Sequence, residues 1–101
     1  MAIAEVSVVP LGTKTPSVSQ YVARAVRILD RETGLKHQTT AMGTIIEGDV
    51  DRILTAVRKM HEEVFQEGAD RVITTIKIDD RRDKVQSAKG KLYSLKNKLQ
   101  L

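Results

Sequence analysis

The stretch that decides the fold is AIAEVSVV, residues 2–9, in which apolar side chains recur at every second position. Successive side chains of a strand point to opposite faces. One face would therefore carry only apolar residues, namely Ala4, Val6 and Val8. The other face would mix apolar and polar residues, namely Ile3, Glu5, Ser7 and Val9. The pattern predicts a strand with one strongly apolar face, and RVITTIKI, residues 71–78, alternates in the same way and predicts another.

Two amphipathic helices and two short strands are predicted between these outer strands. Apolar residues recur at spacings of three and four from Val18 to Leu29 and again from Val50 to Val64, which is typical of helices with one buried face. Residues 36–42 and 44–47 have extended patterns on either side of Gly43, and they predict a hairpin or a bent pair of strands. A last helix is predicted over about residues 84–99.

The predicted order is strand, helix, strand, strand, helix, strand, in two similar halves of about residues 1–42 and 43–80. This is the plan of the α+β ferredoxin-like βαββαβ sandwich. It has a four-stranded antiparallel sheet in the order 4-1-3-2 with two helices on one face, followed here by a C-terminal helix. A chain of 101 residues is predicted to form a single ferredoxin-like domain, residues 1–101. The second face of the sheet would remain uncovered.

The composition, with 41% hydrophobic and 30% charged residues, is typical of a folded globular chain. Cysteine is absent, which excludes disulfides, thiolate metal sites and a cysteine nucleophile. Only three residues are aromatic, too few for a platform that stacks single-stranded bases. No apolar run approaches the roughly 18 residues of a membrane span, and the first residues lack a signal-peptide pattern. We therefore expect a cytoplasmic location and no membrane partner.

Positive charge is concentrated near the C-terminal end. Residues 81–101 carry seven Lys and Arg against one Asp, whereas residues 1–80 carry ten Lys and Arg against twelve Asp and Glu. A basic helix of this kind is either a solvated face or a contact surface for nucleic acid or an anionic membrane. An apolar seam also runs along it: Val85, Ala88, Leu92, Leu95 and Leu99. The seam predicts self-association across a two-fold axis, with packing inside one subunit as the alternative.

No group of residues points to catalysis. His37 and His61 lie on different predicted elements without the spacing of a metal pair. Motifs for a serine nucleophile, a phosphate loop or dinucleotide binding are absent from the sequence. The run Asp79-Asp80-Arg81-Arg82-Asp83 favours a solvated turn with local ion pairs over a site for a divalent cation or a phosphate. We expect no enzyme activity, no bound metal and no cofactor.

Charged side chains within strands are the residues that most directly suggest binding. Glu5, Glu47 and Lys77 lie in runs that are otherwise half-buried, and a charge on such a face needs a partner or a ligand. A carboxylate beside apolar residues and hydroxyls can hold a cationic, partly aromatic small molecule. The hydroxyls that we expect near these charges are Ser7, Thr44 and Thr75. The alternative is that Glu5 and Lys77 pair with each other across adjacent strands.

Five segments together resemble the small thiamine-binding protein family, long known only as an uncharacterised conserved family. They are SVVPLGT (7–13), SVSQYVARAVRIL (17–29), TAMGTIIEGD (40–49), MHEEVFQEGADRV (60–72) and TTIKIDDRRD (74–83). The resemblance runs from about residue 3 to residue 99. It implies ferredoxin-like subunits that dimerise through their sheets and commonly form a tetramer as a dimer of dimers. It also implies binding of thiamine or its pyrimidine portion, without an established reaction.

The resemblance also points to ligand-binding positions within its matched motifs. The first candidates, within these motifs, are Thr13, Met42, Gly43, Thr44 and Glu47. Further candidates are Ser19 and, outside the matched motifs, Glu5. A carboxylate would offset the thiazolium charge or accept a hydrogen bond from the amino group, the hydroxyls would donate or accept hydrogen bonds, and the glycine would let the backbone approach the ligand closely.

The sequence thus predicts a non-enzymatic, homo-oligomeric binding protein for thiamine or its aminopyrimidine portion, with pockets on the sheet face and a role in sequestration, transport or salvage. The alternative is a regulatory or structural oligomer whose basic C-terminal helix contacts nucleic acid or a protein partner. Of these two partners, nucleic acid is not expected.

Overall fold

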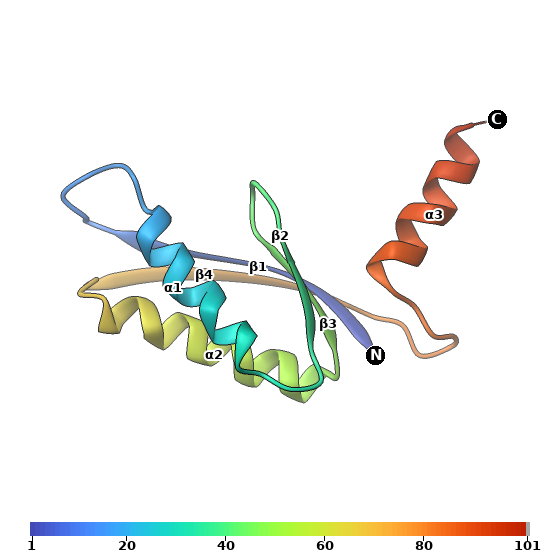
Figure 1. Ribbon diagram of the computed structural model, residues 1–101, viewed down its shortest axis with the longest axis horizontal. Helices are drawn as coiled ribbons and strands as arrows, with labels where there is room; N and C mark the ends of the chain where they lie inside the picture. Colours follow the sequence, from blue (N-terminus) through green and yellow to red (C-terminus); the bar gives the residue numbers. More distant parts are fainter. Residues whose placement is uncertain (101) are drawn as a thin grey trace.

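The computed structural model describes residues 1–100 and is built around one four-stranded antiparallel sheet (Figure 1). The strands are β1 (Ala2–Leu11), β2 (Lys36–Thr39), β3 (Thr44–Gly48) and β4 (Arg71–Asp80). Neighbouring strands follow the order β2-β3-β1-β4, which is the predicted order 4-1-3-2 read from the opposite edge. The predicted α+β ferredoxin-like fold is therefore confirmed.

Helices α1 (Ser19–Asp30) and α2 (Val50–Gln66) lie side by side on one face of the sheet (Figure 1). The side chain of Asp49 caps α2 by accepting hydrogen bonds from the backbone N–H groups of Asp51 and Arg52. Arg24 of α1 ties the two helices together, because it donates to Glu63 at 3.0 Å and also pairs with Glu67. Among the helices of residues 1–100, none is long and apolar enough to cross a membrane.

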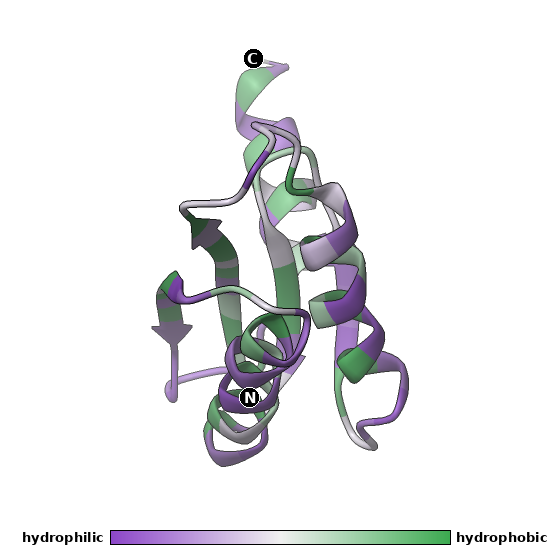
Figure 2. Ribbon diagram, turned by 90° about the vertical axis from the view of Figure 1, so that its left-hand side faces the viewer, coloured by the Kyte–Doolittle hydropathy of each residue, from purple (hydrophilic) through white to green (hydrophobic). Residues whose placement is uncertain are grey.

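The core lies between the sheet and these two helices. Alternate residues of β1 point into it and are almost fully buried: Ala2, Ala4, Val6 and Val8. Buried side chains of α2 belong to the same cluster: Ile53, Ala56, Val57, Met60 and Val64. Figure 2 shows the helices banded by apolar and polar residues, as expected of helices that bury one side. The predicted division of β1 into a buried face and a more exposed face is confirmed.

Helix α3 (Ala88–Leu99) stands apart from the sandwich (Figure 1). It begins later than the predicted residue 84, because Ser87 caps it by accepting a hydrogen bond from the Gly90 N–H at 2.9 Å. Residues 81–87 form the preceding loop instead. No residue of α3 is buried, and its leucines are 55%, 53% and 74% exposed at Leu92, Leu95 and Leu99. Packing of the seam inside one subunit is therefore not found within residues 1–100.

Candidate functional site

The short length of β3 leaves a notch at the edge of the sheet. β1 pairs with β4 over all ten of its residues. On its other side, β1 pairs with β3 only from Ala2 to Val6, whose partner is Thr44. Residues 7–11 of β1 therefore have no strand beside them on that side.

A cavity of about 150 Å³ occupies this notch, and we call it the hairpin slot. Aliphatic side chains form most of its lining, together with the turn between β2 and β3: Val6, Val8, Val9, Val22, Ala25, Val26, Met60 and residues 39–44. The polar side chains in the lining are all hydroxyls: Ser7, Thr39, Thr40 and Thr44. An uncharged, mostly apolar lining with a few hydroxyls suits a small flat ring that makes few hydrogen bonds.

The turn that closes one side of the slot is held by Thr40. The Thr40 hydroxyl donates to the carbonyl oxygen of Gly43 at 2.7 Å and accepts from the N–H groups of Met42 and Gly43 at 3.3 and 3.2 Å. A Cβ atom at Gly43 would lie 2.9 Å from the carbonyl oxygen of Val6, so glycine allows the turn to approach β1 this closely. The Met42 side chain is 86% exposed in the same turn.

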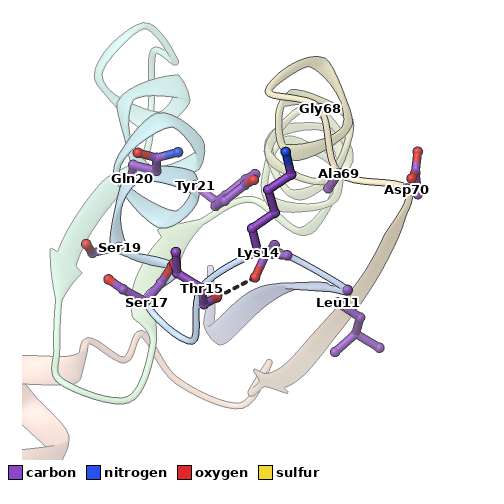
Figure 3. A pocket seen from close by; sticks show the side chains of 12 residues that line it. Leu11, Lys14, Thr15, Ser17, Ser19, Gln20, Tyr21, Gly68, Ala69 and Asp70 are labelled. Carbon is purple, nitrogen blue, oxygen red and sulfur yellow. Dashed lines mark hydrogen bonds between the residues drawn. The ribbon is translucent and has the colours of Figure 1, made fainter.

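A second, more polar hollow of about 500 Å³ lies where β1 leads into α1, and we call it the loop chamber. Its lining comprises residues 11–15, Ser17, residues 19–21 and residues 68–70. The Thr13 hydroxyl donates to the carbonyl oxygen of Thr15 at 2.7 Å, which orders the loop. Figure 3 shows the Lys14 side chain reaching between Tyr21 and Gly68, whereas Leu11 points away.

The open face of the sheet holds the two candidate glutamates. Glu5 lies opposite Lys77 in the pairing of β1 with β4, yet no ion pair joins them among the salt bridges of residues 1–100. Its side chain instead lies beside the turn, since Glu5 Cγ is 3.7 Å from the position of a Cβ at Gly43. Glu47 accepts a hydrogen bond from the backbone N–H of Ala88 at 2.8 Å, so it holds the start of α3.

The seven candidate residues thus fall in three places. Met42, Gly43 and Thr44 line the hairpin slot, with Glu5 beside it. Thr13 and Ser19 line the loop chamber. Glu47 lies on the open face under α3.

One expectation about these side chains is wrong. Thr44 does not share the open face with Glu5 and Glu47, because it alternates with Ile45 and is 3% exposed on the helix side of β3. It reaches the slot from the core instead of from the open face.

Two residues of the slot escaped sequence reasoning. The sequence pattern predicts that Val8 and Val22 are core residues, and it does not indicate that they line a cavity. In the structure both line the hairpin slot. The available signal was the unequal length of the predicted strands, since the alternation of residues 2–9 is longer than the extended pattern of residues 44–47. Neighbouring antiparallel strands of unequal length leave part of the longer strand unpaired.

The charged run of residues 79–83 begins in the last two residues of β4, and residues 80–83 form local ion pairs, as predicted. Arg81 pairs with Asp83 and Arg82 pairs with Asp80. The hydrogen bond from Arg82 holds the pKa of the Asp80 carboxyl below its usual value, and the hydrogen bond from Arg81 does the same to the pKa of Asp83. Asp79 points elsewhere: it pairs with Lys91 of α3, whose hydrogen bond is the main cause of the lowered pKa of Asp79.

The histidines have ordinary partners in the fold. His61 Nδ1 lies 2.7 Å from the hydroxyl of Thr74, which links α2 to β4, and His37 lies 3.4 Å from the carboxylate of Asp30. Within the described residues, no group of three or more His, Cys, Asp or Glu side chains is placed to hold a metal ion.

Comparison with known proteins gives concordant matches. A family model described as thiamine-binding protein matches residues 4–96. The UPF0045 protein YqgV of Bacillus subtilis is 46% identical over 103 residues and is covered to 99%, as is this chain. The crystal structure of the hypothetical protein MJ1052 from Methanocaldococcus jannaschii has a TM-score of 0.87 at 43% identity, covering 94% of this chain and 95% of that one.

A more distant structure has the same fold. A Thermotoga maritima protein, described as a candidate for thiamine biosynthesis or salvage, has a TM-score of 0.77 at 19% identity and covers 93% of this chain and 97% of its own. At this level of identity the likeness concerns the fold alone.

Proposed function

Because the chain belongs to the thiamine-binding protein family, we propose that it is a cytoplasmic protein that binds thiamine, or the aminopyrimidine part of thiamine, without transforming it. The pocket is the hairpin slot, at the edge of the sheet and not in the middle of its open face. One observation carries this choice: the segment Met42-Gly43-Thr44, to which the family resemblance assigns ligand binding, lines an uncharged cavity. The role that fits such binding is sequestration, transport or salvage.

The size and chemistry of the slot support a single heterocyclic ring as its occupant. A cavity of ~150 Å³ in an apolar protein interior can hold benzene, and the slot has about this volume. An aminopyrimidine is a ring of similar size with a few polar atoms on its edge. Glu5, beside Gly43, supplies a negative charge close to the turn, where it would offset the positive charge of the attached thiazolium.

The loop chamber would serve a different part of the ligand. Tyr21 lines the loop chamber and the adjacent Val22 lines the hairpin slot, so the same turn of α1 contributes to the lining of both cavities. We assign Thr13 and Ser19 to whatever part of a longer ligand extends beyond the ring. Removing both hydroxyls should then weaken binding of thiamine and leave binding of the free aminopyrimidine unchanged.

A thermal-shift titration with thiamine, thiamine phosphates and the free aminopyrimidine tests the proposed function. A ligand that binds only the native state raises the melting temperature with increasing concentration. We expect a rise that follows a one-site binding curve with thiamine or the aminopyrimidine. The absence of any rise at millimolar concentrations of all these ligands would contradict the proposal.

We also propose that the chain works as a homo-oligomer, with a second copy covering its unpartnered apolar surfaces. The leucines of α3 are more than half exposed, and Val9 and Ile73, which lie opposite each other on the open sheet face, are also exposed. Each copy therefore has an exposed helix seam and an exposed sheet face. Two copies related by a two-fold axis can cover both surfaces in one interface.

A further inference from the structure

The position of a proline in β1 shows which backbone groups face the notch. Pro10 lies within β1 and pairs in register with Val72 of β4. Proline has no backbone N–H, so inside a sheet it is tolerated where its nitrogen points away from a neighbouring strand. The nitrogen of Pro10 therefore points away from β4 and toward the side on which β3 ends.

The close contact between Gly43 and Val6 also shows which backbone groups of β1 point away from β4. The carbonyl oxygen of Val6 lies 2.9 Å from the position of a Cβ at Gly43, so this carbonyl points toward β3. In an antiparallel strand, the N–H and C=O of one residue point to the same side, and the side alternates from residue to residue. Ala4, Val6, Val8 and Pro10 therefore all direct their backbone groups away from β4.

Val8 is left without a strand to pair with. The pairing of β1 with β3 ends at Val6, so the N–H and C=O of Val8 point into the notch. Val8 is only 6% exposed, and no other residue between 1 and 100 makes a turn, loop or cap hydrogen bond to its backbone. A buried backbone donor and acceptor without partners are costly, and most such groups in native proteins are satisfied.

We propose that the N–H and C=O of Val8 form the recognition edge of the hairpin slot and bind a planar heterocycle that carries an amino group next to a ring nitrogen. The ring nitrogen accepts a hydrogen bond from the Val8 N–H, and the amino group donates one to the Val8 C=O. The aliphatic side chains of Val22 and Ala25 provide apolar contacts to the ring. This inference rests on the proposed function, because the aminopyrimidine of thiamine has this edge.

The ligand side of the inference is tested with two pyrimidines that differ at one position. Calorimetry compares the free aminopyrimidine with the same ring carrying hydrogen in place of the amino group. Loss of one neutral hydrogen bond that leaves the Val8 carbonyl unpaired should weaken binding about tenfold. Equal affinities for the two rings would overturn the assignment of the Val8 carbonyl, although the proposed function would stand.

The protein side is tested by replacing one backbone amide with an ester. In the full chain, 2-hydroxyisovalerate in place of Val8 keeps the side chain and removes the N–H. It also makes the Ser7 carbonyl, which faces Thr75 of β4, a weaker acceptor. We expect roughly tenfold weaker binding of the aminopyrimidine, since the ring nitrogen loses its donor, and only a small change in melting temperature.

The matched control is the ester at Ala4, with lactate in place of alanine, because the N–H of Ala4 faces Ile46 in the β1–β3 ladder and Ala4 does not line the hairpin slot. It should lower the melting temperature and leave the affinity of the folded protein within about twofold of wild type. Unchanged affinity in the Val8 ester would overturn the inference while leaving thiamine binding intact. Failure of the unmodified protein to bind either thiamine or the aminopyrimidine would overturn the proposed function, and the inference with it.

Discussion

Gly43 is the residue on which the shape of the hairpin slot depends most. It brings the turn of residues 40–43 against the carbonyl of Val6 and so sets the width of the notch. From the sequence, glycine between two short strands predicts a turn and a close approach of the backbone. The sequence does not show what the backbone approaches, because that depends on the register of β3 against β1.

The substitution Gly43→Ala should therefore disturb the slot. Its Cβ would meet the Val6 oxygen at 2.9 Å, and relief of that clash requires the turn to move. We expect a loss of about 1–3 kcal/mol in the free energy of unfolding, together with weaker binding of the aminopyrimidine. Urea denaturation and calorimetry measure the two effects.

The control for this change is Gly90→Ala in α3, far along the chain from the slot. It should leave the affinity unchanged. If Gly43→Ala unfolds at the wild-type urea concentration and binds with wild-type affinity, the close contact that we describe does not shape the pocket.

At the scale of elements, α3 is attached to the sheet by two carboxylates on either side of Ile3. Glu47 and Asp79 are both opposite Ile3 in the strand pairings. Glu47 accepts from the N–H of Ala88, and Asp79 pairs with Lys91. The contact at Glu47 competes with the ligand-binding role that the sequence suggested for this residue.

The substitution Glu47→Ala separates these two roles. Loss of the acceptor should speed hydrogen exchange at the Ala88 amide and leave the affinity for the aminopyrimidine unchanged, because Glu47 does not line the slot. Glu47→Gln keeps an acceptor oxygen and should retain most of the protection. A clear loss of affinity in Glu47→Ala with the Ala88 amide still protected would instead make Glu47 a ligand group.

The attachment of α3 should also depend on pH. The pKa of Asp79 is lowered, mainly by its hydrogen bond with Lys91, so the contact is fully present above the ordinary aspartate pKa of about 3.9. It is lost as the pH falls through the lowered pKa of the folded protein. The NMR signals of α3 amides should shift over this acidic range and not between pH 5 and pH 8.

Asp79→Asn is the reference for that titration, since it cannot ionise. The α3 signals of this variant should show a much smaller acid shift. An equal shift in both proteins would mean that other carboxyl groups, and not Asp79, control the position of α3.

The sequence predicted best those elements that are defined by interactions between residues close together in the chain. The alternation in residues 2–9 and 71–78 predicted both long strands, and it predicted the buried face of β1, because side-chain periodicity is local. The start of α3 and the side of Thr44 were predicted wrongly. The first depends on the cap at Ser87, which leaves no periodic signal. The second could have been predicted, because Thr44 and Glu47 are three residues apart in one strand and alternation places them on opposite faces.

At the scale of the whole molecule, the open sheet face and the seam of α3 are the surfaces that a second copy would cover. Leu95→Lys should reduce the mass measured by light scattering, because a charge in the seam must be desolvated on association. Asn97→Lys adds the same charge to the same helix outside the seam, and it should leave the mass unchanged. Equal masses for wild type and Leu95→Lys would exclude α3 from the contact between copies.

The alternative function, in which the basic C-terminal helix contacts nucleic acid, can be tested by varying the salt concentration. Binding of this helix to a nucleic acid would weaken steeply as salt is raised, because bound counterions are released. Four of the basic side chains around α3 line an open groove: Arg81, Lys84, Lys91 and Lys98. Lys91 already pairs with Asp79, however, and we expect no binding of duplex or single-stranded oligonucleotides at moderate salt.

The central claim is that the notch beside β1 binds the ring of the ligand, and amide chemical-shift mapping tests it most directly. The assigned, ¹⁵N-labelled protein is titrated with the free aminopyrimidine. The account predicts that the largest saturable shifts occur at Val8, Val22 and Gly43, with little change at Glu47 or Lys77. Largest shifts at Glu47 and Lys77, with none at Val8, would place the ligand on the open face of the sheet and contradict the account.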